Sequence, residues 1–139
     1  MESLLIDAGA LIALFNKRDT CHSRMLEFLK KQEAIYRTTW PVISEASRLL
    51  DFTLNVQIGL LKWIERFSLN LFEIPDSPIS KILFYCTKYS DIPMDLGDST
   101  LMAASEKKGT YKIVSIDSDF YLYHDFRNRH LQNVFLSSY

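Results

Sequence analysis

The stretch LLIDAGALIALF, residues 4 to 15, decides the fold that we expect for this chain. It opens with a short apolar run, Leu4 to Ile6, which is typical of a buried strand. After Asp7 the apolar side chains follow helical spacing instead, at i, i+3, i+4 and i+7 from Ala8 to Phe15. Asp7 therefore lies at a junction between a strand and a helix, where a buried carboxylate is costly unless its charge is compensated.

Three further acidic residues lie at positions where burial of a carboxylate is energetically unfavourable. Glu45 lies in the apolar stripe of a helix that begins near Pro41, and Asp98 lies in the stripe of a helix that begins within MDLGDSTLMAAS, residues 94 to 105. Asp117 closes an apolar strand over residues 112–116. Several buried carboxylates repel each other, so such a set persists only with a compensating charge. Mg²⁺ or Mn²⁺, which prefer oxygen ligands, would supply it.

The rest of the chain alternates short strands with helices. We expect one more strand over residues 34–37 and an apolar run over residues 69–74 that ends at a proline. Helical spacing of apolar residues predicts further helices, marked by these sets: His22, Met25, Leu26 and Leu29; Val42, Ala46 and Leu49; Leu60, Trp63, Ile64 and Phe67; Ile79, Ile82, Leu83 and Cys86. This alternation implies parallel βαβ units and one α/β domain over residues 1–139.

The topology of such a domain predicts that the four acids meet. Asp7 and Asp117 lie at the carboxyl ends of strands, where open parallel sheets bind their ligands. Glu45 and Asp98 lie in the first turns of helices that start at the same edge. A divalent ion held there would neutralise a phosphate, lower the pKa of a bound water and favour cleavage of a phosphodiester. Whether the site takes one ion or two stays open.

Composition limits the class of protein. The 139 residues are 47% hydrophobic and 24% charged, as in one globular domain with a core. The net charge of −1 neither supports nor excludes RNA as a partner. Because the sequence has neither a secretory leader nor an apolar run of about 20 residues, we expect a cytoplasmic protein with no membrane contact. Cys21 and Cys86 lack metal-ligand spacing, and Cys86 is predicted to be a buried free thiol.

Four motifs, LLIDAGALIALF, PVISEASRLL, MDLGDSTLMAAS and KIVSIDSDF, resemble in their order and spacing the PIN-domain nucleases, in particular the VapC-type toxins of bacterial and archaeal toxin–antitoxin pairs. The resemblance covers nearly the whole chain. It implies a three-layer α/β/α sandwich with a central parallel sheet, and endoribonuclease activity. It also implies that Asp7, Glu45, Asp98 and Asp117 are the catalytic residues and hold Mg²⁺ or Mn²⁺. The implied partners are an RNA substrate, an antitoxin whose C-terminal segment blocks the acidic site, and a second copy of the chain.

Three residues are expected to support the four acids. Ser115 stands where the family often has threonine, and its hydroxyl should hydrogen-bond a carboxylate or a metal-bound water. Asp95 would prepare the entry to the following helix. Asp119 is placed at the rim of the site, although with Asp117 it also fits a polar turn that caps the segment from Phe120.

Each acid also has a simpler explanation when it is taken alone. Asp7 and Asp98 are plausible N-caps, because an aspartate at a helix start accepts hydrogen bonds from backbone N–H groups. Glu45 could pair with Arg48, its i+3 neighbour, or lie at the edge of the helix. The joint pattern favours the metal site, because four such coincidences at one sheet edge are improbable.

Two groups of basic residues have open roles. Arg127 and Arg129 follow aromatic residues between positions 121 and 126, a composition suited to phosphate contacts and base stacking, but equally to aromatic core packing with a solvated arginine rim. Lys17 and Arg18 end the first helix, where they favour the helix dipole or steer a substrate.

Three other functions compete with the nuclease. A non-catalytic module of the same fold, which binds RNA or protein through the acidic pocket, is the main alternative. A phosphoacceptor receiver domain fits poorly because Asp7 has no adjacent acid, and a haloacid-dehalogenase-type phosphatase fits poorly because Gly9 stands where a second aspartate is needed. The candidate dimer surfaces are the helices with Trp63 and Phe67 or with Ile82 and Tyr89, unless these side chains pack in the core.

Overall fold

The computed structural model describes residues 1–66, 68–73, 79–92 and 94–138, and it contains a five-stranded parallel sheet between helices. The strands have the order β3-β2-β1-β4-β5, and every neighbouring pair is parallel. The strands are β1 (Glu2–Ile6), β2 (Ala34–Thr38), β3 (Leu69–Leu71), β4 (Lys112–Val114) and β5 (Gln132–Asn133). The helices are α1 (Ala8–Phe15), α2 (His22–Lys31), α3 (Trp40–Leu49), α4 (Leu54–Glu65), α5 (Ile79–Lys88) and α6 (Leu96–Lys108).

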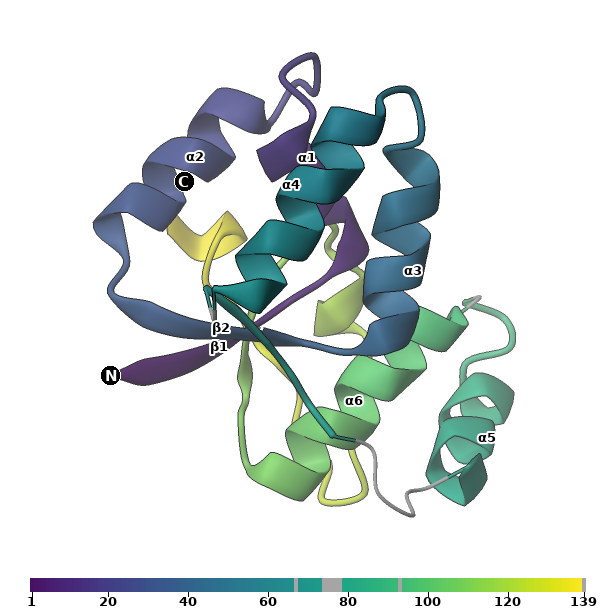
Figure 1. The fold of residues 1–139 in the computed structure, drawn as a ribbon. Helices are drawn as coiled ribbons and strands as arrows, with labels where there is room; N and C mark the ends of the chain where they lie inside the picture. Colours follow the sequence, from purple (N-terminus) through teal and green to yellow (C-terminus); the bar gives the residue numbers. More distant parts are fainter. Residues whose placement is uncertain (67, 74–78, 93, 139) are drawn as a thin grey trace.

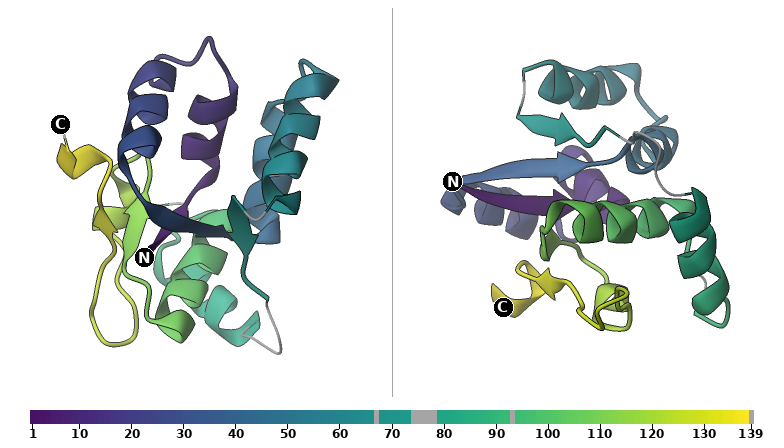
Figure 2. Two further views of the ribbon diagram at one scale, coloured as in Figure 1. Left: turned by 60° about the vertical axis from the view of Figure 1, so that its left-hand side comes forward. Right: turned by 90° about the horizontal axis from the view of Figure 1, so that it is seen from below.

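Helices cover both faces of the sheet, so the predicted three-layer α/β/α architecture is confirmed. In Figure 1, α1, α2 and α4 lie above the sheet and α6, with α5 beside it, lies below. Figure 2 gives the same layers from two other sides. The chain goes from β1 to β2 and β3 on one side of the sheet, and β4 and β5 occupy the other side. Strand order therefore reverses beside β1, and ligands gather at such a switch point in open α/β sheets.

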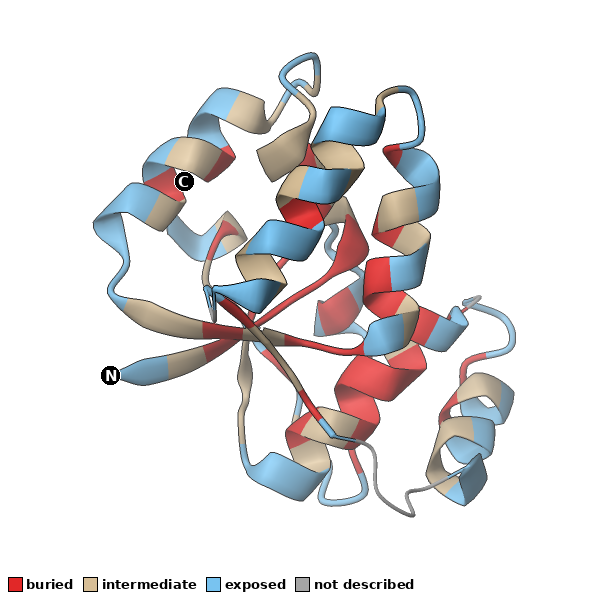
Figure 3. Ribbon diagram, viewed as in Figure 1, coloured by how far each residue is buried: buried red, intermediate tan, exposed pale blue. Residues whose placement is uncertain are grey.

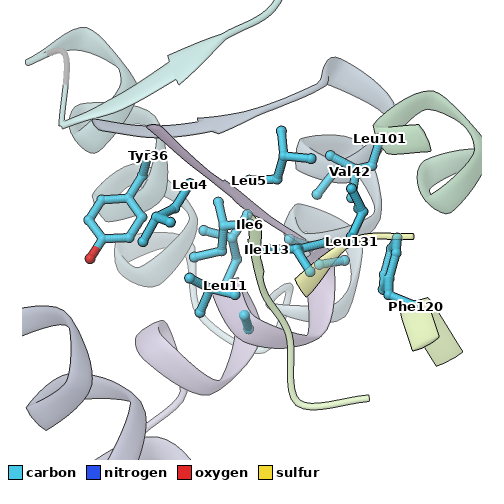
Figure 4. Packing of buried hydrophobic residues seen from close by; sticks show 14 of the residues in the cluster. Leu4, Leu5, Ile6, Leu11, Tyr36, Val42, Leu101, Ile113, Phe120 and Leu131 are labelled. Atoms are coloured by element: carbon cyan, nitrogen blue, oxygen red, sulfur yellow. The ribbon is translucent and has the colours of Figure 1, made fainter. Parts of the chain in front are cut away.

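The central strand β1 explains why its sequence is so apolar. Leu4, Leu5 and Ile6 are buried between the two helical layers, as Figures 3 and 4 show. A strand covered on both faces carries a continuous apolar run rather than an alternating one. After Ile6 the chain turns at once into α1, whose Leu11 packs back into the same core. The strand-to-helix switch predicted at Asp7 is confirmed.

The long helix α6 begins and ends where its sequence predicts. Asp95 is the N-cap, and its side chain accepts a hydrogen bond from the backbone N–H of Asp98 over 2.7 Å. Gly109 is the C-cap with a φ of 67°, a left-handed conformation that suits glycine. Lys107 and Lys108 occupy the last turn, near the negative end of the helix dipole.

Strand β4 is shorter than the predicted strand over residues 112–116. It ends at Val114, because the next polar groups of the backbone bond to side chains rather than to a neighbouring strand. The carbonyl groups of Ser115 and Asp117 each accept a hydrogen bond of 3.0 Å from the Asn133 side chain. The segment after β4 is therefore a fixed loop.

Two apolar stripes predicted for helices are corrected. In α5 the stripe of Ile79, Ile82, Leu83 and Cys86 was expected to face the core, but only Tyr85 is buried, while Ile79 and Leu83 are exposed. Tyr85 faces α6, where its hydroxyl donates a hydrogen bond of 2.6 Å to Glu106. Cys86 is a free thiol, as predicted, but half-buried.

In α3 the exposed Leu49 does not share the buried face of Val42 and Ala46. Ile43 and Leu50 complete that face instead. In α2 the buried side chains are Met25 and Phe28, whereas His22 donates a hydrogen bond of 2.8 Å from Nδ1 to the Ala13 carbonyl. The predicted helices are thus present, with their faces rotated slightly.

Two residues that marked the suggested dimer surfaces, Trp63 and Tyr89, pack inside the molecule, whereas Leu61 of α4 and Leu83 of α5 are exposed. The homodimer stays a prediction. Trp63 packs edge-on against Phe15 and stacks on Tyr36, with ring centroids 5.6 and 6.4 Å apart. Tyr89 is buried, and its hydroxyl accepts a hydrogen bond of 2.6 Å from the backbone N–H of His124. Core packing therefore accounts for both residues, and Phe67 lies outside the described residues.

Within the part of the chain that the structure describes, every helix is too short or too polar to span a bilayer.

Candidate active site

Asp7 is a buried carboxylate held by two hydrogen bonds. It is only 4% exposed, at the end of the central strand β1. Its Oδ1 accepts a hydrogen bond of 3.0 Å from the backbone N–H of Ala10, so it is indeed the N-cap of α1. Its Oδ2 accepts one of 2.5 Å from the Ser115 hydroxyl. The cap role and the predicted serine contact are both confirmed, and together they fix the orientation of the carboxyl group.

The loop after β4 brings Asp117 to the same sheet edge. Ser115 Oγ, besides bonding Asp7, accepts a hydrogen bond of 3.0 Å from the backbone N–H of Asp117. The buried Asn133 of β5 holds both residues through their carbonyl groups. Asp117 is consequently exposed beside the buried Asp7, with a backbone that the surrounding side chains hold in place.

Asp98 lies in the first turn of α6, half-buried, and it is not the N-cap that its sequence position allowed. Asp95 takes that role, which explains why the sequence needs an aspartate three residues before Asp98. The Tyr123 hydroxyl approaches Asp98 Oδ2 to 3.5 Å. The carboxylate of Asp98 is therefore left for something other than capping.

Glu45 reaches the same place from α3. A Cβ atom built on Gly97 would lie 3.4 Å from Glu45 Oε2 and 3.4 Å from Asp95 Oδ1, so these two carboxylates flank the first turn of α6. A cavity of about 400 Å³ opens beside them, lined by Pro41, Ser44, Glu45, Arg48, Asp95, Leu96 and Gly97. The described residues contain no ion pair between Glu45 and Arg48.

A buried hydrogen bond ties the two helices together. The hydroxyl groups of Thr39, at the start of α3, and Thr100 in α6 lie 2.7 Å apart. Thr100 also donates to the Gly97 carbonyl over 2.7 Å. This contact fixes Glu45 relative to Asp98. We refer to Asp7, Glu45, Asp98 and Asp117 as the acidic cluster.

Burial and the charges of neighbouring carboxylates raise the pKa of every member of the acidic cluster. Burial, offset by its hydrogen bonds with Ser115 and Ala10 and reinforced by the charges of Asp117 and Glu45, raises the pKa of Asp7 to about 7. Burial and then the charges of Asp95, Asp7, Glu45 and Asp119 raise the pKa of Asp98 to about 8.

The two more accessible members behave in the same way. Loss of water and the charge of Asp95 raise the pKa of Glu45, although Arg48 opposes this shift. Loss of water and the charges of Asp119 and Asp95 raise the pKa of Asp117. The acids lie close enough to feel each other's charge, and no ion pair in the described ranges neutralises them.

The acidic cluster consists of carboxylates, the side chains that hard divalent cations prefer. As they stand, no three His, Cys, Asp or Glu side chains in residues 1–66, 68–73, 79–92 and 94–138 are arranged as the ligands of one metal ion. Mg²⁺, however, is commonly bound through one or two carboxylates, with waters completing its octahedron. Uncompensated carboxylates also repel each other, and a cation would relieve this repulsion. Asp7, Asp98 and Asp117, with Glu45 beside the first turn of α6, are the residues that would hold the ion.

Of the other residues singled out in the sequence, Asp119 lies beside this site and the two arginines lie away from it. Asp119 is exposed at the start of a short 3-10 helix, Asp119–Tyr121, and its charge acts on Asp98 and Asp117, so it lies at the rim as predicted. Arg127 is exposed and Arg129 half-buried, at the far end of the following loop.

Sequence reasoning missed the residues that hold the acidic cluster in place. Thr39, Thr100, Asn133 and Tyr123 are all buried and bond to cluster members or to their helices and loops. A threonine or asparagine in an apolar stretch is a weak signal, because its partner is known only once the fold is known.

The sequence matches no family model. No curated protein matches it in sequence either. Among solved structures, that of VapC20 from Mycobacterium tuberculosis, described as a sarcin-ricin loop cleaving toxin, is similar over 86% of this chain and 93% of that chain, with a TM-score of 0.78 and 16% sequence identity. The chain therefore has the fold that its resemblance to PIN-domain nucleases predicts.

Proposed function

We propose that this chain is a metal-dependent endoribonuclease, which hydrolyses phosphodiester bonds of RNA as the toxin of a type II toxin–antitoxin pair. The observation that carries the proposal is the acidic cluster at the switch point of the sheet, where four carboxylates from four segments repel each other. The similar fold of a toxin that cleaves the sarcin-ricin loop supports this assignment.

The chain's own residues have distinct tasks in this proposal. Asp7 is the most rigid ligand, because Ser115 and the first turn of α1 hold both of its oxygens. Asp98 and Asp117 face it from α6 and from the loop after β4, and Glu45 adds negative charge from α3. When bound, Mg²⁺ or Mn²⁺ supplies positive charge for the phosphate and lowers the pKa of a water.

The test is cleavage of a sarcin-ricin loop hairpin by purified protein with Mg²⁺ or Mn²⁺. Asp7→Asn keeps the size of the side chain but removes its charge, so we expect cleavage to fall at least roughly a hundredfold. Asp51→Asn is the matched control, because Asp51 is an exposed acid in the turn between α3 and α4. Equal activity of the wild type and the Asp7 variant would remove the basis of the proposal.

A non-catalytic module of the same fold is the second candidate, favoured by one observation. Among the described residues the acids are not arranged as ready ligands of one ion. Such a module would bind RNA or a protein equally well after Asp98→Asn or Asp117→Asn. Binding that survives both changes, in a protein that cleaves nothing, would favour the module.

The toxin assignment brings partners that can be sought directly. We propose an antitoxin that covers the acidic cluster, a homodimer, and residence in the cytoplasm. Growth arrest on expression of the chain, and rescue by the product of a small neighbouring reading frame, would support the pair. No arrest with an active nuclease would instead favour an RNA-processing role.

A further inference from the structure

A second cavity lies at the opposite end of α6 from the acidic cluster. It has a volume of about 460 Å³ and is lined by the cationic side chains of Lys81, Lys107, Lys108, Arg127 and Arg129, together with Glu106, Gly109 and Tyr111. We refer to it as the basic pocket. In Figure 1 the end of α6 and the loop that precedes β5 lie next to each other at the bottom of the molecule.

The basic pocket carries an excess of positive charge in a chain whose net charge is −1. Lys81 pairs with Glu106, and Arg129 pairs with Asp125. In the described residues Lys107, Lys108 and Arg127 make no ion pair. Five cations thus face two carboxylates, which leaves a surplus of three positive charges. Such a local field attracts anions, whatever the net charge of the whole chain.

The loop that carries the two arginines is preformed. Asp125, only 3% exposed, accepts hydrogen bonds of 2.9 Å from the backbone N–H groups of both Arg127 and Arg129, and one of 3.2 Å from Arg129 Nε. Asn128 between them has a φ of 61°, which tightens the turn. The Arg129 guanidinium lies 4.1 Å from the centre of the Tyr111 ring. Binding of a ligand would therefore cost little free energy for ordering this loop.

One segment of chain connects the acidic cluster to the basic pocket along α6. It starts at Asp117, its Tyr123 approaches Asp98, and it reaches the pocket at Arg127. The same two ends are joined by α6, in which Asp98 and Lys107 are separated by nine residues, or about 14 Å at 1.5 Å per residue. A strand of RNA that enters the acidic cluster and follows α6 would have a later phosphate at the pocket.

We propose that the basic pocket binds a backbone phosphate of the RNA substrate, a few nucleotides from the bond to be cleaved; this rests on the proposed function. Arginine forks and lysine ammonium groups are the usual donors to phosphate. Tyr111, the aromatic residue among those that line the pocket, already carries the Arg129 guanidinium over one face of its ring. The contact would position RNA of any sequence rather than read its bases.

The test compares two triple variants with the same change in charge. Lys107→Gln, Lys108→Gln and Arg127→Gln together remove the unpaired cations of the pocket, whereas Lys30→Gln, Lys62→Gln and Arg66→Gln remove exposed cations elsewhere. Fluorescence anisotropy with a labelled sarcin-ricin loop hairpin in EDTA measures binding without cleavage. All six side chains are exposed, so both variants should unfold at the temperature of the wild type.

We expect the pocket variant to bind about tenfold more weakly or worse at 0.1 M salt, and the control variant to bind as the wild type does. The slope of log affinity against log salt should fall by about 0.7, because one phosphate contact to a single strand contributes about 0.7. Equal affinity and slope in the pocket variant would overturn the proposal, even if cleavage depends on Asp7. A selective loss of binding would support it, even if the wild type cleaves nothing.

Discussion

Asp7 shows how a buried carboxylate is tolerated at the end of a central strand. Its two oxygens accept hydrogen bonds from Ala10 and Ser115, which stabilise the charged form, but burial and the neighbouring acids outweigh them. The balance leaves its pKa near 7, so without a cation the group is partly protonated at neutral pH. The protonation state of Asp7 therefore depends on Ser115 and on any bound ion.

Removal of the serine hydroxyl should weaken the site without removing a member of the acidic cluster. Ser115→Ala leaves Asp7 Oδ2 without its hydrogen bond of 2.5 Å, and we expect RNA cleavage to fall about tenfold or more, as for other groups that orient metal ligands. Ser115→Thr keeps the hydroxyl and should retain most activity. Ser118→Ala, at an exposed serine of the same loop, is the control. Full activity of the alanine variant at position 115 would contradict this role.

The raised pKa of Asp7 predicts how stability depends on pH in EDTA. Since its folded pKa of about 7 lies above the ordinary 3.8, folding favours the protonated form. This contribution is fully present below about pH 4 and is lost as the pH rises through about 7. The urea midpoint should fall between about pH 5 and pH 8 in the wild type and in Asp51→Asn, and fall less in Asp7→Asn. Identical pH profiles in all three proteins would refute the prediction.

Among the elements, α6 does most to organise the functional surface. Its first turn carries Asp98 and its cap Asp95, and its last turn carries two lysines of the basic pocket. Thr100 attaches it to α3, and Glu106 attaches it to α5 through Tyr85 and Lys81. A change in where α6 begins or ends would therefore shift both candidate sites.

The C-terminal end of α6 can be tested with two single variants, each of which replaces a glycine with alanine. Gly109→Ala should destabilise the protein by about 1 kcal/mol, because the φ of 67° is unfavourable for a side chain even though the space around it is open. Gly59→Ala lies inside α4, where a new Cβ would touch only Phe15 at 3.7 Å, and should stabilise by roughly 0.5 to 1 kcal/mol. Urea unfolding measures both. The two substitutions should change the free energy of unfolding in opposite directions. A stabilising Gly109→Ala would contradict the left-handed C-cap of α6.

For the whole molecule, the sheet topology is what gathers the four acids. They come from the end of β1, the loop after β4, the second turn of α3, where a first-turn position was predicted for Glu45, and the first turn of α6; the crossovers around β1 bring these points to one edge. The repulsion that results is a global cost of the fold in the absence of a cation. Ion binding and folding should therefore be coupled.

Divalent ions should consequently raise the thermal stability of the whole protein. At 100 times its dissociation constant an ion that binds only the folded state adds about 2.7 kcal/mol. We expect Mn²⁺ to raise the unfolding temperature of the wild type and of Asp51→Asn, and to have little effect on Asp7→Asn or Asp98→Asn. Calorimetry with and without Mn²⁺ measures this. An equal increase in all four proteins would mean that the ion binds elsewhere.

Much of the fold could be predicted because its signals are local. The apolar run of β1, the switch to helical spacing after Asp7 and the glycine after α6 each act within a few residues. The family resemblance implied that Ser115 bonds a carboxylate or a metal-bound water, and the structure identifies Asp7 as its partner. Predictions failed where exposure mattered, as in α5, because an amphipathic pattern does not say how much of a helix another element covers.

By itself, then, the sequence determined the strands and helices, their parallel alternation and the identity of the acids, since spacing and residue type act along the chain. Tertiary structure alone decided that Thr39 meets Thr100, that Asn133 holds the loop before Asp117, and that cations from three segments line one pocket. These contacts join residues far apart in sequence, and their partners are fixed only when packing of the core selects which faces touch.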